Sequence, residues 1–314
     1  MGIRRFFYSI IFVSAIALAV LLYILKPSLL GAWVAWRPSS VNNTVVSMAP
    51  KDRSSEEGAR TQTPYGLRVA PGFTLDLLAQ GVVGARVIAE DDDGNLWVSQ
   101  TKQGTITRLE KESGQVVKKE IVLSGLRQPH GLAFDPNDAT ILYVATEDAL
   151  WRYDRDMLTT KPEMVVRFPT GGRHVTRTIR FGSYGWLYVS IGSTCNVCVE
   201  HDERLAAISR INVHAAQPQL LPFASGLRNA VFMTEHPVTH DLIVTEMGRD
   251  YLGDDAPPDE INRIKEEQHY GWPWCYGANI HDRNFDTRAI SPCREPLVTP
   301  SMIDLPAHSA PLGI

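Results

Sequence analysis

The sequence predicts an all-β protein folded as a β-propeller, and two observations carry this prediction. An apolar and aromatic strand core recurs at intervals of roughly 45 residues, and a second short apolar strand follows each copy. Within each unit, turn-forming pairs such as Asp93-Gly94 and Asp135-Pro136 separate the strands. Units of this length with several short strands are typical of propeller blades, whereas solenoid units are shorter or helical.

Each unit is expected to hold at least three strands, which recur in the same order along the chain. The first strands are expected at residues 86–89, 131–134, 178–181 and 230–233. The second strands are expected at residues 96–98, 142–144, 187–189 and 242–244. The third strands are expected at residues 106–109, 150–153, 208–211 and 261–264. Residues 65–314 are therefore expected to form about four blades.

The ends of this region indicate a propeller that continues. From Met302 to Ile314 the chain has the pattern of a connector that enters a fifth unit. Residues 73–78 fit the outer strand that closes a ring onto its final blade, and that blade has no counterpart in the sequence. We therefore expect the chain to be part of a longer protein, truncated at the start of a fifth blade.

The N-terminal residues predict export and a membrane anchor. Residues 6–25 form an uncharged apolar run long enough to cross a bilayer, and Arg4 and Arg5 before it place the N-terminus in the cytoplasm. Residues 1–26 are interpreted as a cytoplasmic N-terminus with a transmembrane signal-anchor, and residues 27–64 as a flexible tether. A cleaved signal peptide is the alternative. Either reading exports the domain; the anchor would hold it at the inner membrane, facing the periplasm.

Charge and cysteine content narrow the function classes. The chain has 31 basic and 35 acidic residues, a net charge of −4, so nucleic-acid binding is not expected. The four cysteines form two local pairs, Cys195 with Cys198 and Cys275 with Cys293. No second Cys-x-x-Cys motif completes a set of four metal ligands, and in an exported domain structural disulfides are the preferred interpretation.

The spacing of the repeats locates the functional face. The loop between the second and third strands is longer in units three and four than in units one and two. In an antiparallel blade this loop emerges on the same face as the connector into the next blade. Those connectors carry His130, His174, Arg228-Asn229 and His308. Insertions and polar side chains are therefore expected to converge around one end of the central channel, where a propeller binds its ligand.

Two features of this face could carry chemistry. His174 lies just before a strand, where an imidazole with an ordinary pKa of about 6.5 can act as a general base; a packing histidine is the alternative. The insertion from Glu246 to Glu260 holds six carboxylates and two glycines. Such irregular acidic loops bind Ca²⁺, although a solvated loop is the alternative. Residues 270–276 are strongly aromatic and are interpreted as core packing beneath the loops.

An ordered set of short motifs runs through the chain from residue 65 to the end. Its members are Gly172–His174, Leu187–Gly192, Cys195–Cys198, Gly226–Asn229, Glu246–Gly248, Asp259–Asn262, Tyr270–Pro273 and His308–Gly313. Together they resemble the soluble quinoprotein glucose/sorbosone dehydrogenase family, whose members bind pyrroloquinoline quinone (PQQ) and calcium on a six-bladed propeller. Cys195–Cys198 and His308–Gly313 look most like the sorbosone dehydrogenase branch.

The resemblance implies oxidation of an aldose or aldehyde by hydride transfer to PQQ. It makes His174 the general base that removes the hydroxyl proton of the substrate. It makes Arg228 a catalytic and cofactor-binding residue that contacts the quinone oxygens as they become negative. Asn229 and His308 are the further cofactor-binding residues that it implies.

The resemblance also implies a calcium site. The backbone carbonyls of Gly248 and Arg249 would bind the Ca²⁺ that polarises the quinone. Met247 departs from the family pattern, because glucose dehydrogenases have an amide side chain there. Further basic cofactor contacts of the family come from later blades, beyond Ile314, so this segment alone is expected to lack part of the site.

Two other functions compete with the dehydrogenase. A lactonase-type hydrolase would need side-chain carboxylates at the starts of the first strands, where this sequence offers His130, His174, Asn229 and His308. A membrane-tethered propeller used as a binding scaffold would leave His174 and Arg228 without a catalytic role. The partners expected for the dehydrogenase are a small sugar or aldehyde, an unidentified electron acceptor and the membrane.

Overall fold

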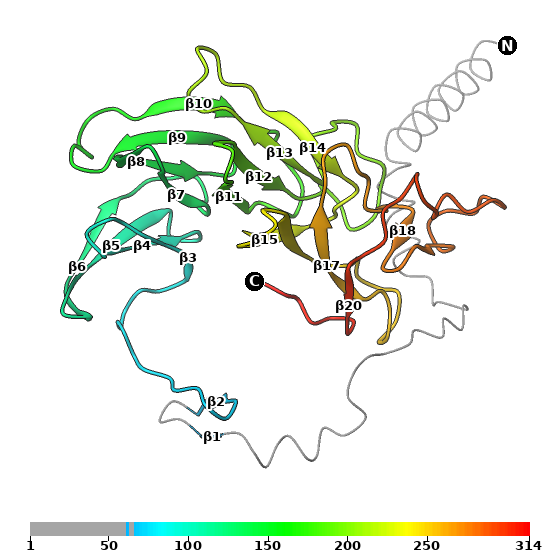
Figure 1. Cartoon of the computed structure of the whole chain (residues 1–314), viewed down its shortest axis with the longest axis horizontal. Helices are drawn as coiled ribbons and strands as arrows, with labels where there is room; N and C mark the ends of the chain where they lie inside the picture. The colour runs from blue at the N-terminus through cyan, green and yellow to red at the C-terminus, as the bar shows by residue number, and fades with distance from the viewer. Residues whose placement is uncertain (1–60, 63–65) are drawn as a thin grey trace, which may run out of the picture.

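The computed structural model describes residues 61–62 and 66–314, and this part of the chain contains β-strands and no helix. Four antiparallel sheets of four strands each follow one another around an arc, as blades one to four (Figure 1). The all-β propeller architecture expected from the sequence is confirmed. The predicted transmembrane segment and nearly all of the predicted tether lie outside the described residues. Within the described residues, no helix has the length and apolar character needed to span a membrane.

The strands of each blade follow chain order from the inside of the arc outward. Blade one contains β3 (Ala85–Glu90), β4 (Leu96–Gln100), β5 (Thr105–Glu112) and β6 (Gln115–Leu123). Blade two contains β7 (Leu132–Asp135), β8 (Asp138–Ala145), β9 (Ala149–Asp154) and β10 (Glu163–Arg167). Blade three contains β11 (Arg177–Phe181), β12 (Leu187–Ile191), β13 (Ala207–Ile211) and β14 (Leu221–Ser225).

Blade four has its outer strand far from the others in sequence. It contains β15 (Ala230–Glu235), β16 (Leu242–Glu246), β17 (Asp259–Ile264) and β20 (Ile303–Leu305). Between β17 and β20 the chain forms the hairpin β18 (Cys275–Tyr276) and β19 (Ile280–His281). A second small hairpin pairs β1 (Thr61–Gln62) with β2 (Arg68–Val69) ahead of the blades.

The repeat predicted the three inner strands of every blade, but it missed the outer strand of blade four. β20 pairs with β17, with Leu305 opposite Asp259, so residues 303–305, which were expected to belong to a connector, complete blade four. The long insertion between β17 and β20 hid this pairing from the sequence pattern. Residues 306–314 contain no strand, and neither do residues 73–78, which were expected to form an outer strand.

Apolar side chains pack between successive blades and form three cores. Alternation along β8 shows why: Leu142 and Val144 face blade one, while Tyr143 and Ala145 face blade three. The core between blades three and four contains Ile208, Met233 and Val244 among others. The second strands β4, β12 and β16 are accordingly buried on both faces, which explains their continuous apolar sequence.

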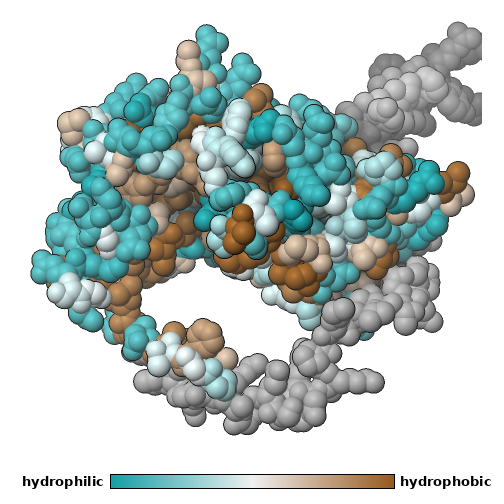
Figure 2. Space-filling model, in the orientation of Figure 1, coloured by the Kyte–Doolittle hydropathy of each residue, from teal (hydrophilic) through white to brown (hydrophobic). Residues whose placement is uncertain are grey.

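The outer surface of the arc is polar. In Figure 2, hydrophilic residues cover most of its convex side, and hydrophobic residues gather along its concave side. β6 illustrates the convex side, because most of its residues are exposed. Its mixed polar sequence gave no strong strand pattern for the same reason.

Candidate active site

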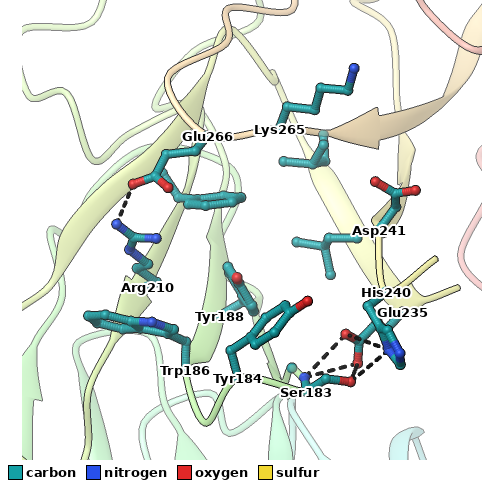
Figure 3. Close-up of a pocket in the computed structure, with 14 residues that line it drawn as sticks. Ser183, Tyr184, Trp186, Tyr188, Arg210, Glu235, His240, Asp241, Lys265 and Glu266 are labelled. Atoms are coloured by element: carbon teal, nitrogen blue, oxygen red, sulfur yellow. Dashed lines mark hydrogen bonds and ion pairs between the residues drawn. The ribbon is translucent and has the colours of Figure 1, made fainter. Parts of the chain in front are cut away.

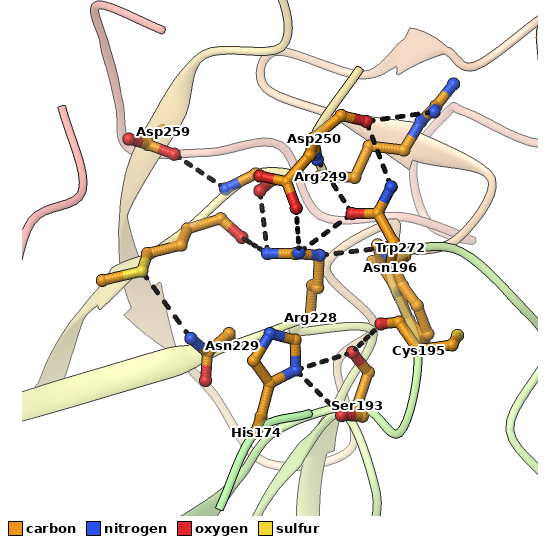
Figure 4. A network of polar contacts seen from close by, with 12 residues as sticks. His174, Ser193, Cys195, Asn196, Arg228, Asn229, Arg249, Asp250, Asp259 and Trp272 are labelled. Carbon is orange, nitrogen blue, oxygen red and sulfur yellow. Dashed lines mark hydrogen bonds and ion pairs between the residues drawn. The ribbon is translucent and has the colours of Figure 1, made fainter. Parts of the chain in front are cut away.

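The candidate site lies at one edge of blades three and four. His174 comes from the connector between β10 and β11, and Arg228 and Asn229 come from the connector between β14 and β15. The long loops 192–206 and 247–258 reach the same edge: the Ser193 amide donates to the Arg228 carbonyl (2.7 Å) and the Met247 amide to the Asn229 carbonyl (3.4 Å). The structure thus brings His174, Arg228 and Asn229 together (Figure 4).

Two glycines let the backbone segments approach closely at this point. Gly172 has a φ of 83°, and a Cβ there would lie 2.2 Å from the Cα of Thr194. A Cβ on Gly192 would lie 2.6 Å from the Cβ of His174 and 2.8 Å from Oδ1 of Asn229. Because only glycine fits these positions, the connector carrying His174 can lie directly against the start of loop 192–206.

The His174 ring is half-buried and held through one nitrogen. Its Nδ1 lies 2.8 Å from the Ser193 carbonyl oxygen and 3.1 Å from Ser193 Oγ. A carbonyl oxygen only accepts, so Nδ1 carries the proton and Nε2 keeps its lone pair. Burial, followed by the nearby Arg228 guanidinium, lowers the pKa of His174 to about 4. At neutral pH the imidazole is therefore uncharged and able to accept a proton at Nε2.

The Arg228 guanidinium is buried and directs its donors at protein oxygens. Nε donates to the Asn196 carbonyl (3.0 Å), and Nη2 donates to Asn196 Oδ1 (2.9 Å) and Asp250 Oδ2 (3.3 Å). Nη1 donates to the carbonyls of Met247 (3.3 Å) and Gly248 (2.9 Å). These bonds engage all five donors that a guanidinium has. The group is fixed in one orientation beside His174 (Figure 4).

Asn196, a residue not predicted from the sequence, is central to this network. Besides binding Arg228, its Oδ1 accepts from the Asp250 amide (2.9 Å) and its Nδ2 donates to the Asp250 carbonyl (3.1 Å). The Trp272 indole donates to the Asn196 carbonyl (3.3 Å). A disulfide joins Cys195 to Cys198 around it. Its place inside this Cys-x-x-Cys motif was the one signal that could have drawn attention to it.

Oxygen atoms of the kind that Ca²⁺ prefers gather around Arg228, and the Gly248 carbonyl of the predicted calcium site is one of them. They include the Met247 and Gly248 carbonyls and the Asp250 carboxylate. Gly248 already accepts from Arg228, but a carbonyl has a second lone pair for a cation. The Arg249 side chain forms a buried bidentate ion pair with Asp282 (2.5 and 3.0 Å), which fixes the loop that presents these carbonyls. The donor set fits Ca²⁺.

Asn229 and His308 differ in how they relate to the site. The Asn229 side-chain amide lies beside His174 and donates to the Met247 sulfur at 3.6 Å. The His308 ring is exposed, with Nε2 lying 2.9 Å from the Gly253 carbonyl of loop 247–258. His308 therefore interacts with loop 247–258, and among the described residues no hydrogen bond links it to His174 or Arg228.

A pair of buried carboxyl groups lies in blade four next to Asn229. Glu246 on β16 and Glu260 on β17 are opposite each other in the sheet. Glu246 accepts from the Asn229 amide (3.0 Å), and Glu260 accepts from the Gly277 amide (2.5 Å) and Asn262 Nδ2 (2.8 Å). Burial raises the pKa of Glu260 to about 7 and the pKa of Glu246 well above its usual range. The sequence pattern had placed both residues in the acidic insertion without indicating their burial.

Cavities lie at both edges of blades three and four. A cavity of about 20 Å³, the size of one water molecule, lies beneath Arg228 and is lined by Glu246, Glu260 and Trp272. A larger pocket of about 360 Å³ lies between the turns that join β11 to β12 and β15 to β16, at the opposite edge of the same blades (Figure 3). Tyr184 and Trp186 contribute to this pocket, and none of the predicted site residues lines it.

The two disulfides lie on the face that carries the site. Cys195 is joined to Cys198 within loop 192–206, and Cys275 is joined to Cys293 within the insertion between β17 and β20. Every cysteine of the sequence is thereby accounted for. The Cys195–Cys198 disulfide borders the Arg228 network. The Cys275–Cys293 disulfide links the hairpin β18–β19 covalently to the segment that follows it.

Sequence comparison identifies relatives across most of the propeller region. An uncharacterised protein of Borreliella burgdorferi is 29% identical over 266 residues, which cover 79% of this chain and 66% of the relative. A pyrroloquinoline quinone-dependent pyranose dehydrogenase of Coprinopsis cinerea is 25% identical over 300 residues, which cover 81% of this chain and 41% of that enzyme. The chain thus spans less than two thirds of the length of each of these relatives.

Structural comparison gives the same fold. The PQQ domain of the Coprinopsis cinerea pyranose dehydrogenase superposes with a TM-score of 0.63 at 19% identity, covering 75% of this chain and 68% of that domain. A calcium structure of a Trichoderma reesei enzyme of carbohydrate-active family AA12 superposes with a TM-score of 0.66 at 22% identity, covering 76% and 71%. The resemblance to quinoprotein sugar dehydrogenases inferred from the motifs is confirmed. Since the family model described as TrAA12-like matches residues 67–314, most of its length, the chain belongs to the TrAA12-like family.

Proposed function

We propose that this protein takes part in the oxidation of a sugar or aldehyde, with PQQ as hydride acceptor and Ca²⁺ as its metal. The observation that carries the proposal is the state of His174: an uncharged imidazole, fixed through Nδ1, beside a buried guanidinium. This is the arrangement that a general base next to developing negative charge requires.

His174 would remove the hydroxyl proton of the substrate. Its Nδ1–H bond to the Ser193 carbonyl fixes the tautomer, so that the proton arrives at Nε2. The lowered pKa keeps the base free at neutral pH, at the cost of a weaker proton affinity than an ordinary histidine has. The bond to Ser193 becomes stronger as the ring gains charge, which offsets part of that cost.

Arg228 would hold positive charge where the oxidant becomes negative, and Asn229 would orient the bound cofactor. PQQ, when bound, supplies the hydride acceptor, and Ca²⁺ supplies a Lewis acid at the Gly248 and Arg249 carbonyls. The contribution of this chain is a fixed cation, oxygen ligands for a metal and an oriented base. His308, whose ring lies against the Gly253 carbonyl, would be a further contact of the cofactor.

The relatives support this proposal at the level of reaction class. The Coprinopsis cinerea enzyme is a PQQ-dependent pyranose dehydrogenase, and calcium is present in a structure of the Trichoderma reesei AA12 enzyme. Because this chain covers 41% of the Coprinopsis enzyme, the activity, the sugar substrate and the electron acceptor remain proposals for the whole protein.

One observation favours a second function, that of a propeller scaffold without catalysis. All five donors of Arg228 have protein acceptors, so this residue is satisfied without any ligand. In a scaffold the network would only join loop 192–206 to loop 247–258.

A dye-reduction assay separates the two functions. The 314-residue chain and the full product of its gene are titrated with PQQ and Ca²⁺, with aldoses and aldehydes as substrates. We expect activity that falls by about 10²–10⁴-fold in His174→Gln and is retained in His240→Gln, a histidine at the opposite edge of the blades. Absence of PQQ binding in every form would exclude the dehydrogenase and leave the scaffold.

We further propose that the domain is exported and anchored at the inner membrane, facing the periplasm. The apolar run at residues 6–25 and the flanking Arg4 and Arg5 motivate this proposal, and the two disulfides agree with an oxidising compartment. Protease accessibility in spheroplasts tests it: the domain should be degraded from outside while remaining in the membrane fraction.

A further inference from the structure

The loop that begins at Gly192 holds both His174 and Arg228. Ser193 accepts from the His174 ring, and Ser193 Oγ donates to the Cys195 carbonyl (2.7 Å). The next residue, Asn196, binds Arg228 through both its backbone and its side chain. The proposed base and the proposed cation are therefore connected through four consecutive residues, 193–196 (Figure 4).

Asn196 binds one edge of the Arg228 guanidinium. It supplies two of the acceptors of Arg228, at 3.0 Å to Nε and 2.9 Å to Nη2, along one edge of the fork. It also pairs with the amide and the carbonyl of Asp250, whose carboxylate supplies a third acceptor. Removal of the Asn196 side chain would therefore remove one acceptor of Nη2 directly and loosen the other, Asp250, while the backbone acceptors of Nε and Nη1 stay.

The backbone around Asn196 is fixed on both sides. The Cys195–Cys198 disulfide closes a loop of four residues, and Val197 inside it is fully buried. Next to the disulfide, the Thr194 amide donates to the Glu200 carboxylate (2.6 Å). Because of these constraints, the backbone carbonyl and the side-chain oxygen of Asn196 both point at the Arg228 guanidinium.

We propose that Asn196 is the positioning residue of this site, setting the orientation of Arg228 beside His174, and that the Cys195–Cys198 disulfide holds Asn196 in place. The catalytic meaning of this role rests on the proposed function, because Arg228 is the group that would stabilise negative charge. Asn196 acts through Arg228 and contacts none of the reacting atoms.

The first test needs no cofactor. The His174 pKa is measured by NMR titration of the cofactor-free protein in wild type, in Asn196→Ala and in the double variant Cys195→Ser/Cys198→Ser. The charged groups that act on His174 are Arg228, Arg173 and Asp250, with Arg228 the strongest. A guanidinium that has lost its Asn196 side-chain acceptor can turn away from the imidazolium and repel it less, so the His174 pKa should rise by about one unit, a tenfold gain in proton affinity.

The second test uses protein loaded with PQQ and Ca²⁺. Misplacement of Arg228 should lower kcat by roughly 10–10²-fold while KM for the sugar changes little, because the lost interaction belongs to the transition state. The double variant Cys275→Ser/Cys293→Ser is the matched control, since its disulfide closes a different segment. It should lower the melting temperature without changing the His174 pKa.

The outcomes are distinguishable. An unchanged His174 pKa in a folded Asn196→Ala protein overturns the positioning role. Asn196→Ser, a smaller change, replaces alanine if Asn196→Ala does not fold, and the same outcome applies to it. Failure of every wild-type form, including the full product of the gene, to bind PQQ and reduce dye refutes the proposed function alone, since the NMR titration still decides whether Asn196 orients Arg228.

Discussion

In the uncharged His174 ring the proton sits on Nδ1, where the Ser193 carbonyl accepts it, and burial and Arg228 lower the pKa to about 4. The pH profile of kcat/KM reports the pKa of the essential base in the free enzyme. With His174 as that base, the acid limb of the profile should lie near pH 4 instead of about 6.5. Arg228→Met should move the limb to higher pH, because the repelling charge is gone. A wild-type limb at about 6.5 would contradict the burial of the base.

The buried pair beneath the site makes a separate prediction about stability. The folded-state pKa of Glu260, about 7, is above the ordinary value of 4.5, so its contribution to stability is complete below about pH 4.5 and is lost as the pH rises through about 7. Glu260→Gln removes this loss and keeps an oxygen for the Gly277 amide. The free energy of unfolding should therefore fall less between about pH 5 and pH 8 in Glu260→Gln than in wild type.

Urea denaturation at several pH values checks this prediction. Glu203→Gln is the control, because Glu203 is exposed and its substitution should leave the pH profile of wild type unchanged. Parallel profiles for wild type and Glu260→Gln would mean that Glu260 is charged in the folded protein at neutral pH.

At the scale of elements, the site depends on the close approach of the connector that carries His174 to Gly192, just after the end of β12. Gly192→Ala would place a Cβ 2.6 Å from the His174 Cβ and 2.8 Å from Asn229 Oδ1, so both side chains must shift. A displacement of about 1 Å at a reacting group can cost 10²-fold in rate, so kcat should fall by about that factor with little loss of β-structure.

The matched control is Gly182→Ala at the opposite end of blade three. There the added Cβ would meet only the edge of the Tyr188 ring at 2.8 Å, which can move. Steady-state kinetics and circular dichroism distinguish the two: equal activity in both glycine variants would show that the close approach at Gly192 is not needed.

The elements of the fold differ in how well the sequence predicts them. Inner strands such as β12 are buried on both faces, so their apolar runs stand out, and all four blades were found from them. Outer strands face solvent, and β20 lies beyond an insertion, so neither has a distinctive pattern. His174 and Arg228 were found through their connectors, whereas Asn196 was not, because hydrogen bonds between distant loops leave no periodic trace.

Across the whole molecule, the candidate site joins two blades. His174 lies on the connector that leads into blade three, and Arg228 lies on the connector that leads into blade four. Loops 192–206 and 247–258 extend from the same two blades. The blades also meet through an apolar core, which includes Ile208 and Val244, and through hydrogen bonds such as that from Ser183 Oγ to Glu235. A ligand bound across this edge would add a further connection between the blades.

Such a ligand should raise the stability of the protein by linkage. A ligand that binds only the folded state adds about 2.7 kcal/mol at a hundredfold excess over its Kd. For a domain of this size that corresponds to a rise in melting temperature of about 5–10 °C. We expect PQQ with Ca²⁺ to produce this rise in a thermal melt, and EDTA to remove most of it, if the Gly248 and Arg249 carbonyls hold the metal as proposed. A melting temperature that stays constant through the whole titration would show that blades three and four lack a functional cofactor site.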